Sequence, residues 1–188
     1  RYIIWQFPID SLIPFSRWFI LPYYYWYVQI AVAFVWLIFS PRTGRLLHRM
    51  VLTLIIADVI GAVFFIAMPT FMIRPEVTGS DLLSQMVRAI YRIDLPFNCF
   101  PSMHVFWAAI LCRYWGLFGP KRLWFRLVNY GGTFMIILST VFTKQHYTPD
   151  ILGGLAAALA ACLLGDRLFA RLSRCCPEKL TQPEPPAA

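Results

Sequence analysis

The sequence MVLTLIIADVIGAVFFIAM occupies residues 50–68 and contains one charged side chain, Asp58. A helix needs about 20 mainly apolar residues to cross the hydrocarbon core of a bilayer, because each residue adds only about 1.5 Å. This stretch has nearly that length and ends at Pro69. It predicts a membrane-spanning helix, and it indicates the class of fold for the rest of the chain.

Four further apolar stretches predict additional spans. They cover residues 21–40, a stretch from about 104 to 116–119, residues 126–143 and residues 151–169. The polar loop after residue 68 contains an amphipathic stretch at 82–95, which suits a helix lying in the membrane interface. The predicted fold is therefore all-α, a polytopic membrane helical bundle with about five spans and an interfacial amphipathic helix in the outer loop.

The composition agrees with lipid as the solvent. Of the 188 residues, 59% are hydrophobic and only 14% are charged, against roughly a quarter in soluble domains. The formal net charge of +8 would raise the question of nucleic acid in a soluble protein. Here the basic residues cluster between apolar runs, which is typical of membrane topology. We therefore expect membrane lipids, and no nucleic acid, as partners.

Basic residues are unevenly divided between alternate loops, which predicts the orientation of the chain. One side collects Arg42, Arg45, Arg49, Lys121, Arg122, Arg126, Arg167, Arg171, Arg174 and Lys179. The other side collects Arg1, Arg17, Arg74, Arg88, Arg92 and Lys144. We expect the richer side to be cytoplasmic in a multi-pass protein of the cell inner membrane or an endomembrane. The opposite face would then meet the periplasm, the exterior or a lumen.

The two ends of the chain differ from the spans. Residues 1–20 mix aromatic side chains with prolines, which suits the headgroup zone, and we expect them to lie on the outer face. A further span before residue 1 would make six in the full-length protein. Residues 1–170 are predicted to form a single transmembrane domain. Residues 171–188, Pro-rich toward their end, are predicted to form a cytoplasmic, disordered tail.

Two charged residues fall inside predicted spans. Asp58 and Arg113 are costly in hydrocarbon and should therefore face the bundle interior. Their similar depth in the predicted bundle suggests that they pair as a structural clamp.

Two of the three histidines, His104 and His146, fall at the outer ends of predicted spans, so topology brings them to one membrane face. Asp150 follows His146 by four residues, or one helical turn, and its carboxylate can reach an imidazole nitrogen. That hydrogen bond would fix the tautomer and leave the other nitrogen free as a nucleophile. Taken alone, the pair is explained as well by an anchored helix end. The third histidine, His48, lies in the basic loop on the other side.

Two more polar residues lie on the face of His104 and His146. Ser102 precedes His104 in a helix-start pattern, and a helix N-terminus offers N–H groups and a partial positive charge to a phosphate. Arg74 offers a planar fork that can bind phosphate in two places. Each residue has an ordinary structural explanation by itself. Their convergence from separate loops favours a site that handles a phosphate group.

These residues resemble the motifs of the type 2 phosphatidic acid phosphatase superfamily over roughly residues 50 to 170. Arg74-Pro75 is similar to the end of its first motif, in which Lys stands seven positions before an Arg-Pro pair. The run 101–104, Pro-Ser-Met-His, is similar to its second motif, Pro-Ser-Gly-His. Ser139, His146 and Asp150 have the spacing of its third motif.

The chain also departs from these motifs. Ala67 stands where the first motif has Lys, Thr140 where the third has Arg, and Met103 where the second has Gly. Lys144 is a candidate to replace one of the missing cations. The run 143–147, Thr-Lys-Gln-His-Tyr, resembles the branch that contains inositol phosphorylceramide synthase and sphingomyelin synthase. That branch passes a phosphoryl headgroup to an alcohol.

The resemblance implies a two-step displacement through a phosphohistidine, carried out by a catalytic domain of residues 1–170. His146 attacks phosphorus while Asp150 holds it, and His104 protonates the leaving oxygen and then activates water or an alcohol. Arg74, Lys144 and Ser102 would bind the phosphate oxygens. No metal or other cofactor is implied, since no acidic cluster in the sequence would hold a metal.

The leading expectation is a membrane phosphatase that hydrolyses a lipid phosphate at the non-cytoplasmic face. The first alternative is a phosphotransferase that moves a phospho-headgroup to a lipid alcohol. The second alternative is a non-catalytic membrane scaffold or transporter, which the two missing cations would favour.

Overall fold

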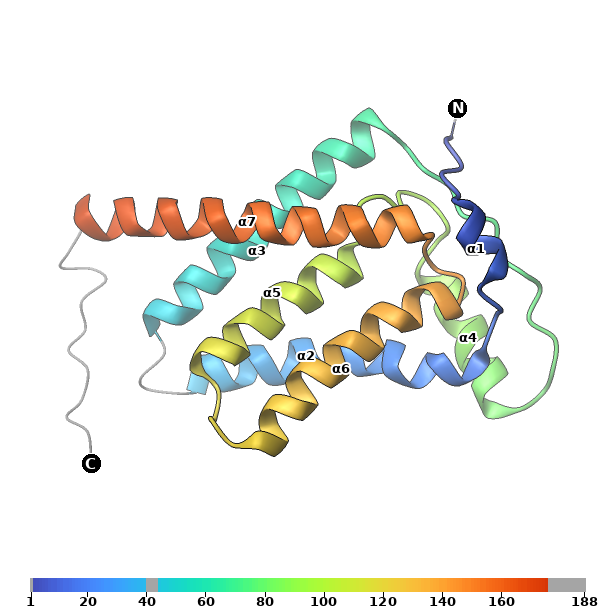
Figure 1. Ribbon diagram of the computed structural model, residues 1–188, viewed down its shortest axis with the longest axis horizontal. Helices are drawn as coiled ribbons and strands as arrows, with labels where there is room; N and C mark the ends of the chain where they lie inside the picture. The colour runs from blue at the N-terminus through green and yellow to red at the C-terminus, as the bar shows by residue number, and fades with distance from the viewer. Residues whose placement is uncertain (1, 40–43, 176–188) are drawn as a thin grey trace.

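The computed structural model describes residues 2–39 and 44–175, and these residues form a bundle of helices with short elements at one end (Figure 1). The long helices are α2 (Ile20–Phe39), α3 (Gly44–Ala67), α5 (Met103–Phe118), α6 (Leu123–Phe142) and α7 (Thr148–Cys175). The short helix α1 (Pro8–Leu12), the 3₁₀ turn η1 (Arg17–Phe19) and α4 (Leu82–Ile93) lie near the end at which α6 meets α7 (Figure 1).

The predicted all-α membrane bundle is confirmed, with two changes at helix ends. Helix α3 begins at Gly44 rather than at residue 50, because the polar first turns find partners: the His48 ring bonds to the Gly44 carbonyl, and Arg49 pairs with Asp166. Helix α7 continues to Cys175, past residue 170, where we expected the tail to begin. The rest of that predicted tail, 176–188, lies outside the described residues.

Four helical stretches are long and apolar enough to cross a membrane: Arg17–Trp36, Gly44–Ala67, Leu123–Phe142 and Thr148–Arg174. The fifth predicted span is α5, which has 16 residues and a length of about 24 Å, against about 30 Å of hydrocarbon. Half of its residues are buried. Helix α5 therefore lies in the middle of the bundle, and the longer helices shield it from lipid.

The core forms around α5, which contacts α2, α3, α6 and α7. Phe106, Ile110 and Leu111 of α5 are fully buried beside Ala57 of α3 and Ala161 of α7. The outer faces of the bundle are apolar as well, as Ile66 of α3 and Leu159 of α7 illustrate with 84% and 63% exposure. Apolar surface on both sides of a helix is expected when lipid is the surrounding solvent.

Small residues set how closely α7 approaches its neighbours. A Cβ atom on Gly154 would stand 2.8 Å from the Ser102 carbonyl oxygen of the α5 cap. A Cβ atom on Gly165 would stand 2.5 Å from Oγ1 of Thr53 on α3. The α7 backbone can come this close to its neighbours only where it carries glycine.

The predicted pairing of Asp58 with Arg113 is wrong. Asp58 accepts a hydrogen bond from the Trp107 indole at 2.8 Å. Arg113 instead donates to Asp166 of α7 at 2.6 Å, and Arg49 of α3 donates to the same carboxylate. Asp58 and Arg113 are thus each satisfied by a different neighbour from the one that depth alone suggested.

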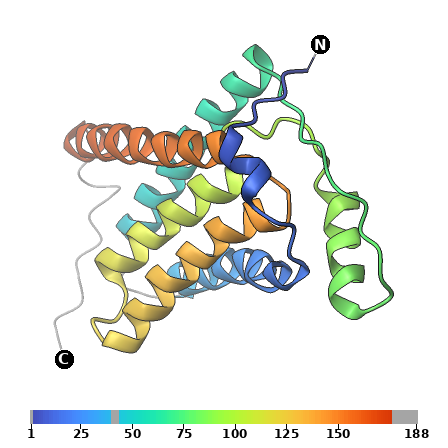
Figure 2. The same ribbon diagram turned by 45° about the vertical axis from the view of Figure 1, so that its right-hand side comes forward.

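Helix α4 confirms the amphipathic helix predicted in the loop after α3, and it stands beside the bundle (Figure 2). The Asp81 side chain caps its N-terminus by accepting from Ser84 N–H. Its apolar face packs into a small core in which Val87 and Ile90 contact Ile20 and Tyr23 of α2. This small core fixes the end of α4 next to the bundle.

The segment before α2 runs across the same end of the bundle. Ile3 exchanges backbone hydrogen bonds with Pro69 and Phe71, and Ser16 N–H donates to the Phe142 carbonyl. The Asp10 carboxylate accepts from the backbone N–H of Thr148, where α7 begins. The predicted interfacial segment is therefore tied to the ends of α3, α6 and α7.

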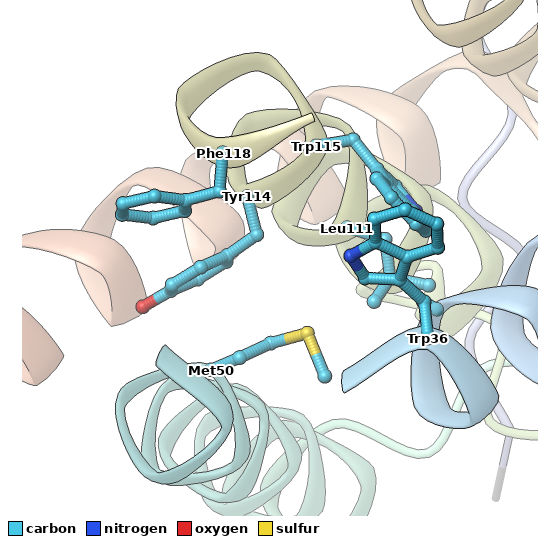
Figure 3. Close-up of a pocket in the computed structure, with 7 residues that line it drawn as sticks. Trp36, Met50, Leu111, Tyr114, Trp115 and Phe118 are labelled. Atoms are coloured by element: carbon cyan, nitrogen blue, oxygen red, sulfur yellow. The ribbon is translucent and has the colours of Figure 1, made fainter. Parts of the chain in front are cut away.

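An apolar pocket of about 20 Å³ lies at the opposite end of the bundle. Figure 3 shows Trp36 of α2, Met50 of α3 and Tyr114 of α5 around it. Its volume corresponds to about one water molecule, and the Tyr114 hydroxyl is already bonded to Thr53. We interpret it as a small packing gap between three helices and not as a binding site.

Candidate active site

A pocket with several polar lining residues, of about 200 Å³, lies at the end of the bundle where α3, α5 and α7 meet the loops around α4. Both predicted catalytic histidines and Arg74 line it. The full lining is Phe65, Arg74, Asp94, Leu95, Phe97, Asn98, Cys99, Met103, His104, Gln145 and His146.

The turn between α6 and α7 positions His146. The N–H groups of Gln145 and His146 both donate to the Thr140 carbonyl, and Lys144 has a φ of 52°, which reverses the chain. Helix α7 then begins, and Oδ2 of Asp150 accepts from the Tyr147 N–H at 2.9 Å. The same oxygen lies 3.3 Å from Nδ1 of His146. Nδ1 therefore carries the proton in this bond, and Nε2 is left with its lone pair.

His104 faces His146 from the first turn of α5. Nδ1 of His104 lies 3.3 Å from Nε2 of His146, and both side chains are buried at 7% exposure. The Ser102 N–H donates to the Asp150 carbonyl at 3.0 Å, which joins the start of α5 to the start of α7. Residues from two separate motifs of the sequence thus lie within hydrogen-bonding distance of each other.

Arg74 lies between α3 and α4 and points into the pocket. One of its terminal nitrogens donates to the Asp94 carbonyl at 2.7 Å, the other donates to the Gln145 side chain, and its guanidinium lies over the Tyr91 ring. Burial lowers the pKa of this guanidinium, while the Asp94 carboxylate opposes that shift. An arginine remains charged under such conditions, so Arg74 brings a fixed positive charge to the pocket.

Lys144 and Ser102 are placed differently from the other predicted site residues. The Lys144 ammonium donates to the carbonyls of Asp10 and Ile13, and burial lowers its pKa. Ser102 is fully buried, and its hydroxyl accepts from the Val105 N–H as the cap of α5. Neither residue is among those that line the pocket.

Sequence reasoning missed several residues of the site: Tyr23, Asp94, Cys99 and Gln145. Gln145 could have been suspected, since it directly precedes His146. Tyr23 and Asp94 carry no local signal, because they reach the site from α2 and from the end of α4.

One group of described residues could hold a metal ion. Cys99, His146 and Asp150 each place one ligand atom within 4.8 Å of the others. Burial raises the pKa of the Cys99 thiol to about 12, and a thiol must lose its proton to bind a metal tightly. The His146 imidazole and the Asp150 carboxylate are already hydrogen-bonded to each other. The donor set therefore fits a metal poorly.

The chain was compared with known proteins. A family model described as the PAP2 superfamily matches residues 9–164. Comparisons with curated proteins and with solved structures gave no match. The matched region contains the residues of both histidine motifs and reaches from α1 into the second half of α7.

Proposed function

The chain belongs to the PAP2 superfamily, and on this basis we propose that it is a membrane-embedded phosphatase that acts on lipid phosphates through a phosphohistidine. One observation carries the proposal: Nε2 of His146 lies 3.3 Å from Nδ1 of His104 in a pocket that also contains Arg74. A nucleophile, an acid and a cation are the minimum set for phosphoryl transfer without a metal.

Two unsatisfied donors support an anion as the ligand. Within the described part of the chain, Nε of Arg74 and Nε2 of Gln145 are buried and have no hydrogen-bond partner. Leaving a buried donor unpaired costs about 1–3 kcal/mol. Both residues line the pocket, so phosphate oxygens bound there could accept from these N–H groups and remove that cost. Gln145 therefore joins Arg74 as a proposed phosphate-binding residue.

The reaction has two steps in this proposal. Nε2 of His146 attacks phosphorus, the ester P–O bond breaks, and His104, which enters the step as the imidazolium, passes its Nδ1 proton to the leaving oxygen and keeps the proton on Nε2. The neutral His104 then takes a proton from water, whose oxygen attacks phosphorus and releases His146. Asp150 holds the proton on Nδ1 of His146 throughout, which keeps Nε2 nucleophilic.

The pocket wall supports a lipid as the substrate. Phe65, Leu95, Phe97 and Met103 line the pocket beside its polar groups, and the bundle around it exposes apolar side chains. We propose that the headgroup enters the pocket while the acyl chains remain in the bilayer. By the distribution of basic residues, the pocket faces the non-cytoplasmic side.

Phosphotransfer to a lipid alcohol is the second candidate. It is favoured by the run 143–147, Thr-Lys-Gln-His-Tyr, which resembles the transferase branch, and by the Asp94 carboxylate in the pocket. A carboxylate repels phosphate but accepts hydrogen bonds from hydroxyl groups, and an acceptor alcohol carries such groups.

The test uses purified protein in lipid nanodiscs with a panel of lipid phosphate monoesters and diesters, with and without lipid alcohols. Release of inorganic phosphate supports the phosphatase, and a new phosphodiester lipid supports the transferase. A protein that turns over none of these substrates would contradict both, and would favour a scaffold or transporter.

Histidine variants test the proposed nucleophile. We expect His146→Ala to abolish turnover and the acid-labile phosphoenzyme, whereas His104→Ala should lower turnover by about 10²–10⁴-fold. The control is His48→Ala, since His48 is exposed and lies at the start of α3. Unchanged turnover in His146→Ala would show that another residue attacks phosphorus.

A further inference from the structure

A tyrosine and a carboxylate lie behind His104, on the side of the ring away from His146. The Tyr23 hydroxyl is 2.7 Å from Nε2 of His104 and 2.6 Å from Oδ2 of Asp94. Tyr23 comes from α2 and is fully buried, while Asp94 caps the C-terminus of α4. Neither residue belongs to the motifs that carry the resemblance, and the proposed mechanism does not yet use them.

The direction of these hydrogen bonds follows from the inventory of protons. A phenol has one O–H, and the ionised Asp94 carboxylate can only accept, so Tyr23 donates to Asp94. The Tyr23 oxygen then accepts from Nε2–H of His104. With its proton on Nε2, the neutral His104 ring has a free lone pair on Nδ1, the nitrogen that faces His146.

We infer that Tyr23 and Asp94 are positioning residues that hold His104 in the tautomer and orientation required for proton transfer at Nδ1. This inference rests on the proposed function. Asp150 acts on His146 directly, whereas Asp94 acts on His104 through the Tyr23 hydroxyl. When Nδ1 takes up a proton, Asp94 at 3.7 Å from Nε2 stabilises the imidazolium that forms.

The surroundings of His104 fit this role. The Tyr23 and Trp26 rings lie against the imidazole, with centroids at 4.8 and 4.3 Å, and they restrict its rotation. Besides Tyr23, the titratable groups that act electrostatically on the ring are His146, Asp94 and Arg74. Arg74 also donates to the backbone carbonyl of Asp94, so Asp94 contacts both the proposed phosphate-binding arginine and Tyr23.

Helix α4 has a function in this arrangement, because it holds Tyr23 and supplies Asp94. Tyr23 is held by the small core that α2 forms with Val87 and Ile90 of α4, and the end of α4 supplies Asp94. The amphipathic helix thus packs against α2 through its apolar face and supplies, at its end, the carboxylate that orients His104 through Tyr23.

The test compares esters that differ only in the leaving group. A nitrophenolate leaves without a proton, whereas an alkoxide needs the proton of His104. We expect Tyr23→Phe to slow phosphoenzyme formation from an alkyl phosphate by about 10–100-fold. This is less than the full effect of general-acid catalysis, because His104 remains but is no longer held in position. Formation from 4-nitrophenyl phosphate should change little. Its breakdown, which needs His104 as a base, should slow, so a burst of nitrophenolate appears.

Two other variants make the test specific. Asp94→Asn keeps an acceptor for Tyr23 and removes the charge, and it should show the same leaving-group pattern with a smaller loss. Tyr114→Phe is the matched control, because it removes a buried hydroxyl that contacts Thr53 in the far half of the bundle. It should leave both esters unaffected. Equal slowing of phosphoenzyme formation from both esters in Tyr23→Phe would overturn the inference.

Nitrogen NMR of the three histidines gives a readout that does not depend on activity. We expect wild-type His104 to have its proton on Nε2, and Tyr23→Phe to show a mixture of tautomers. An unchanged tautomer would overturn the inference while the proposed function stands. A wild-type protein that forms no phosphoenzyme would overturn the proposed function, and this inference with it.

Discussion

At the scale of single residues, two cations near the pocket have different tasks. Arg74 lines the pocket, whereas the Lys144 ammonium donates its hydrogen bonds to the carbonyls of Asp10 and Ile13. We predict that Arg74→Lys lowers kcat/KM by about 10²-fold, because an ammonium cannot reproduce a fork of donors preorganised for the transition state. Steady-state kinetics with a lipid phosphate measures this effect.

The Lys144 variant serves as the comparison. Lys144→Met should lower the thermal midpoint, with a loss of about 1–2 kcal/mol for the two hydrogen bonds, and change kcat/KM much less than Arg74→Lys does. If Lys144→Met lost activity as strongly as Arg74→Lys with an unchanged thermal midpoint, Lys144 would be a phosphate-binding residue, as its sequence position first suggested.

Only part of the candidate site could be predicted from the sequence. His146 and Asp150 could be paired from the sequence, because one helical turn separates them and their contact is local. Tyr23 and His104 are separated by 81 positions, and their contact depends on how α2 packs against α5. No local pattern encodes such a distance, so the residues that orient His104 emerge only from the fold.

At the scale of helices, the approach of α7 to α5 aligns the proposed catalytic groups. We predict that Gly154→Ala lowers turnover by about 10-fold or more, because its Cβ would push α7 away from Ser102 and displace Asp150 relative to His104. Gly131→Ala on α6 is the matched control, since a Cβ there meets nothing within 4 Å. It should leave turnover unchanged and raise stability by up to about 1 kcal/mol. Equal activity of the two variants would show that the packing is not critical.

A shared carboxylate joins three helices away from the site. Asp166 of α7 accepts from Arg49 of α3 and from Arg113 of α5. We predict that Asp166→Asn destabilises the bundle by about 1.5–3 kcal/mol, because two arginines lose their charged acceptor. Thermal unfolding in detergent measures the change.

The control for Asp166 is the exposed ion pair of Arg17 with Asp81. Asp81→Asn keeps a good N-cap for α4 and removes only a surface ion pair, which solvent screens, so the thermal midpoint should change little. If Asp81→Asn lowered the thermal midpoint as much as Asp166→Asn, the pairing of Asp166 with two arginines would not be a special source of stability.

The helices themselves were predictable, and their partners were not. Runs of apolar residues identify spans, because the length of a span is set by the bilayer and is local in sequence. The error over Asp58 and Arg113 has the same origin as the missed Tyr23. Depth in the membrane can be counted along each helix, but the rotation of one helix against another is set by packing, and rotation decides that Arg113 meets Asp166.

At the scale of the whole molecule, the polar groups are divided between two ends of an apolar bundle. Helix α4 and the segment before α2 lie at one end, where the pocket is, while the turn between α5 and α6 and the start of α3 lie at the other (Figure 1). The basic residues of the richer side that the structure describes belong to the helix ends and the loop at this second end: Arg45, Arg49, Lys121, Arg122, Arg126, Arg167, Arg171 and Arg174. By the positive-inside rule, we propose that the pocket lies at the outer face and receives lipids of the outer leaflet.

Thiol labelling tests this orientation. Ser80 at the pocket end and Lys121 at the other end are both exposed, and each is replaced by Cys in a chain in which Cys175 and Cys176 are Ser. Cys99, Cys112 and Cys162 are buried and can stay. A membrane-impermeant maleimide should label Ser80→Cys in intact cells or spheroplasts, and Lys121→Cys only after the membrane is opened. The reverse order would place His104 and His146 on the cytoplasmic side. The substrate would then have to come from the cytoplasmic leaflet, where the lipid phosphates made by soluble kinases first appear.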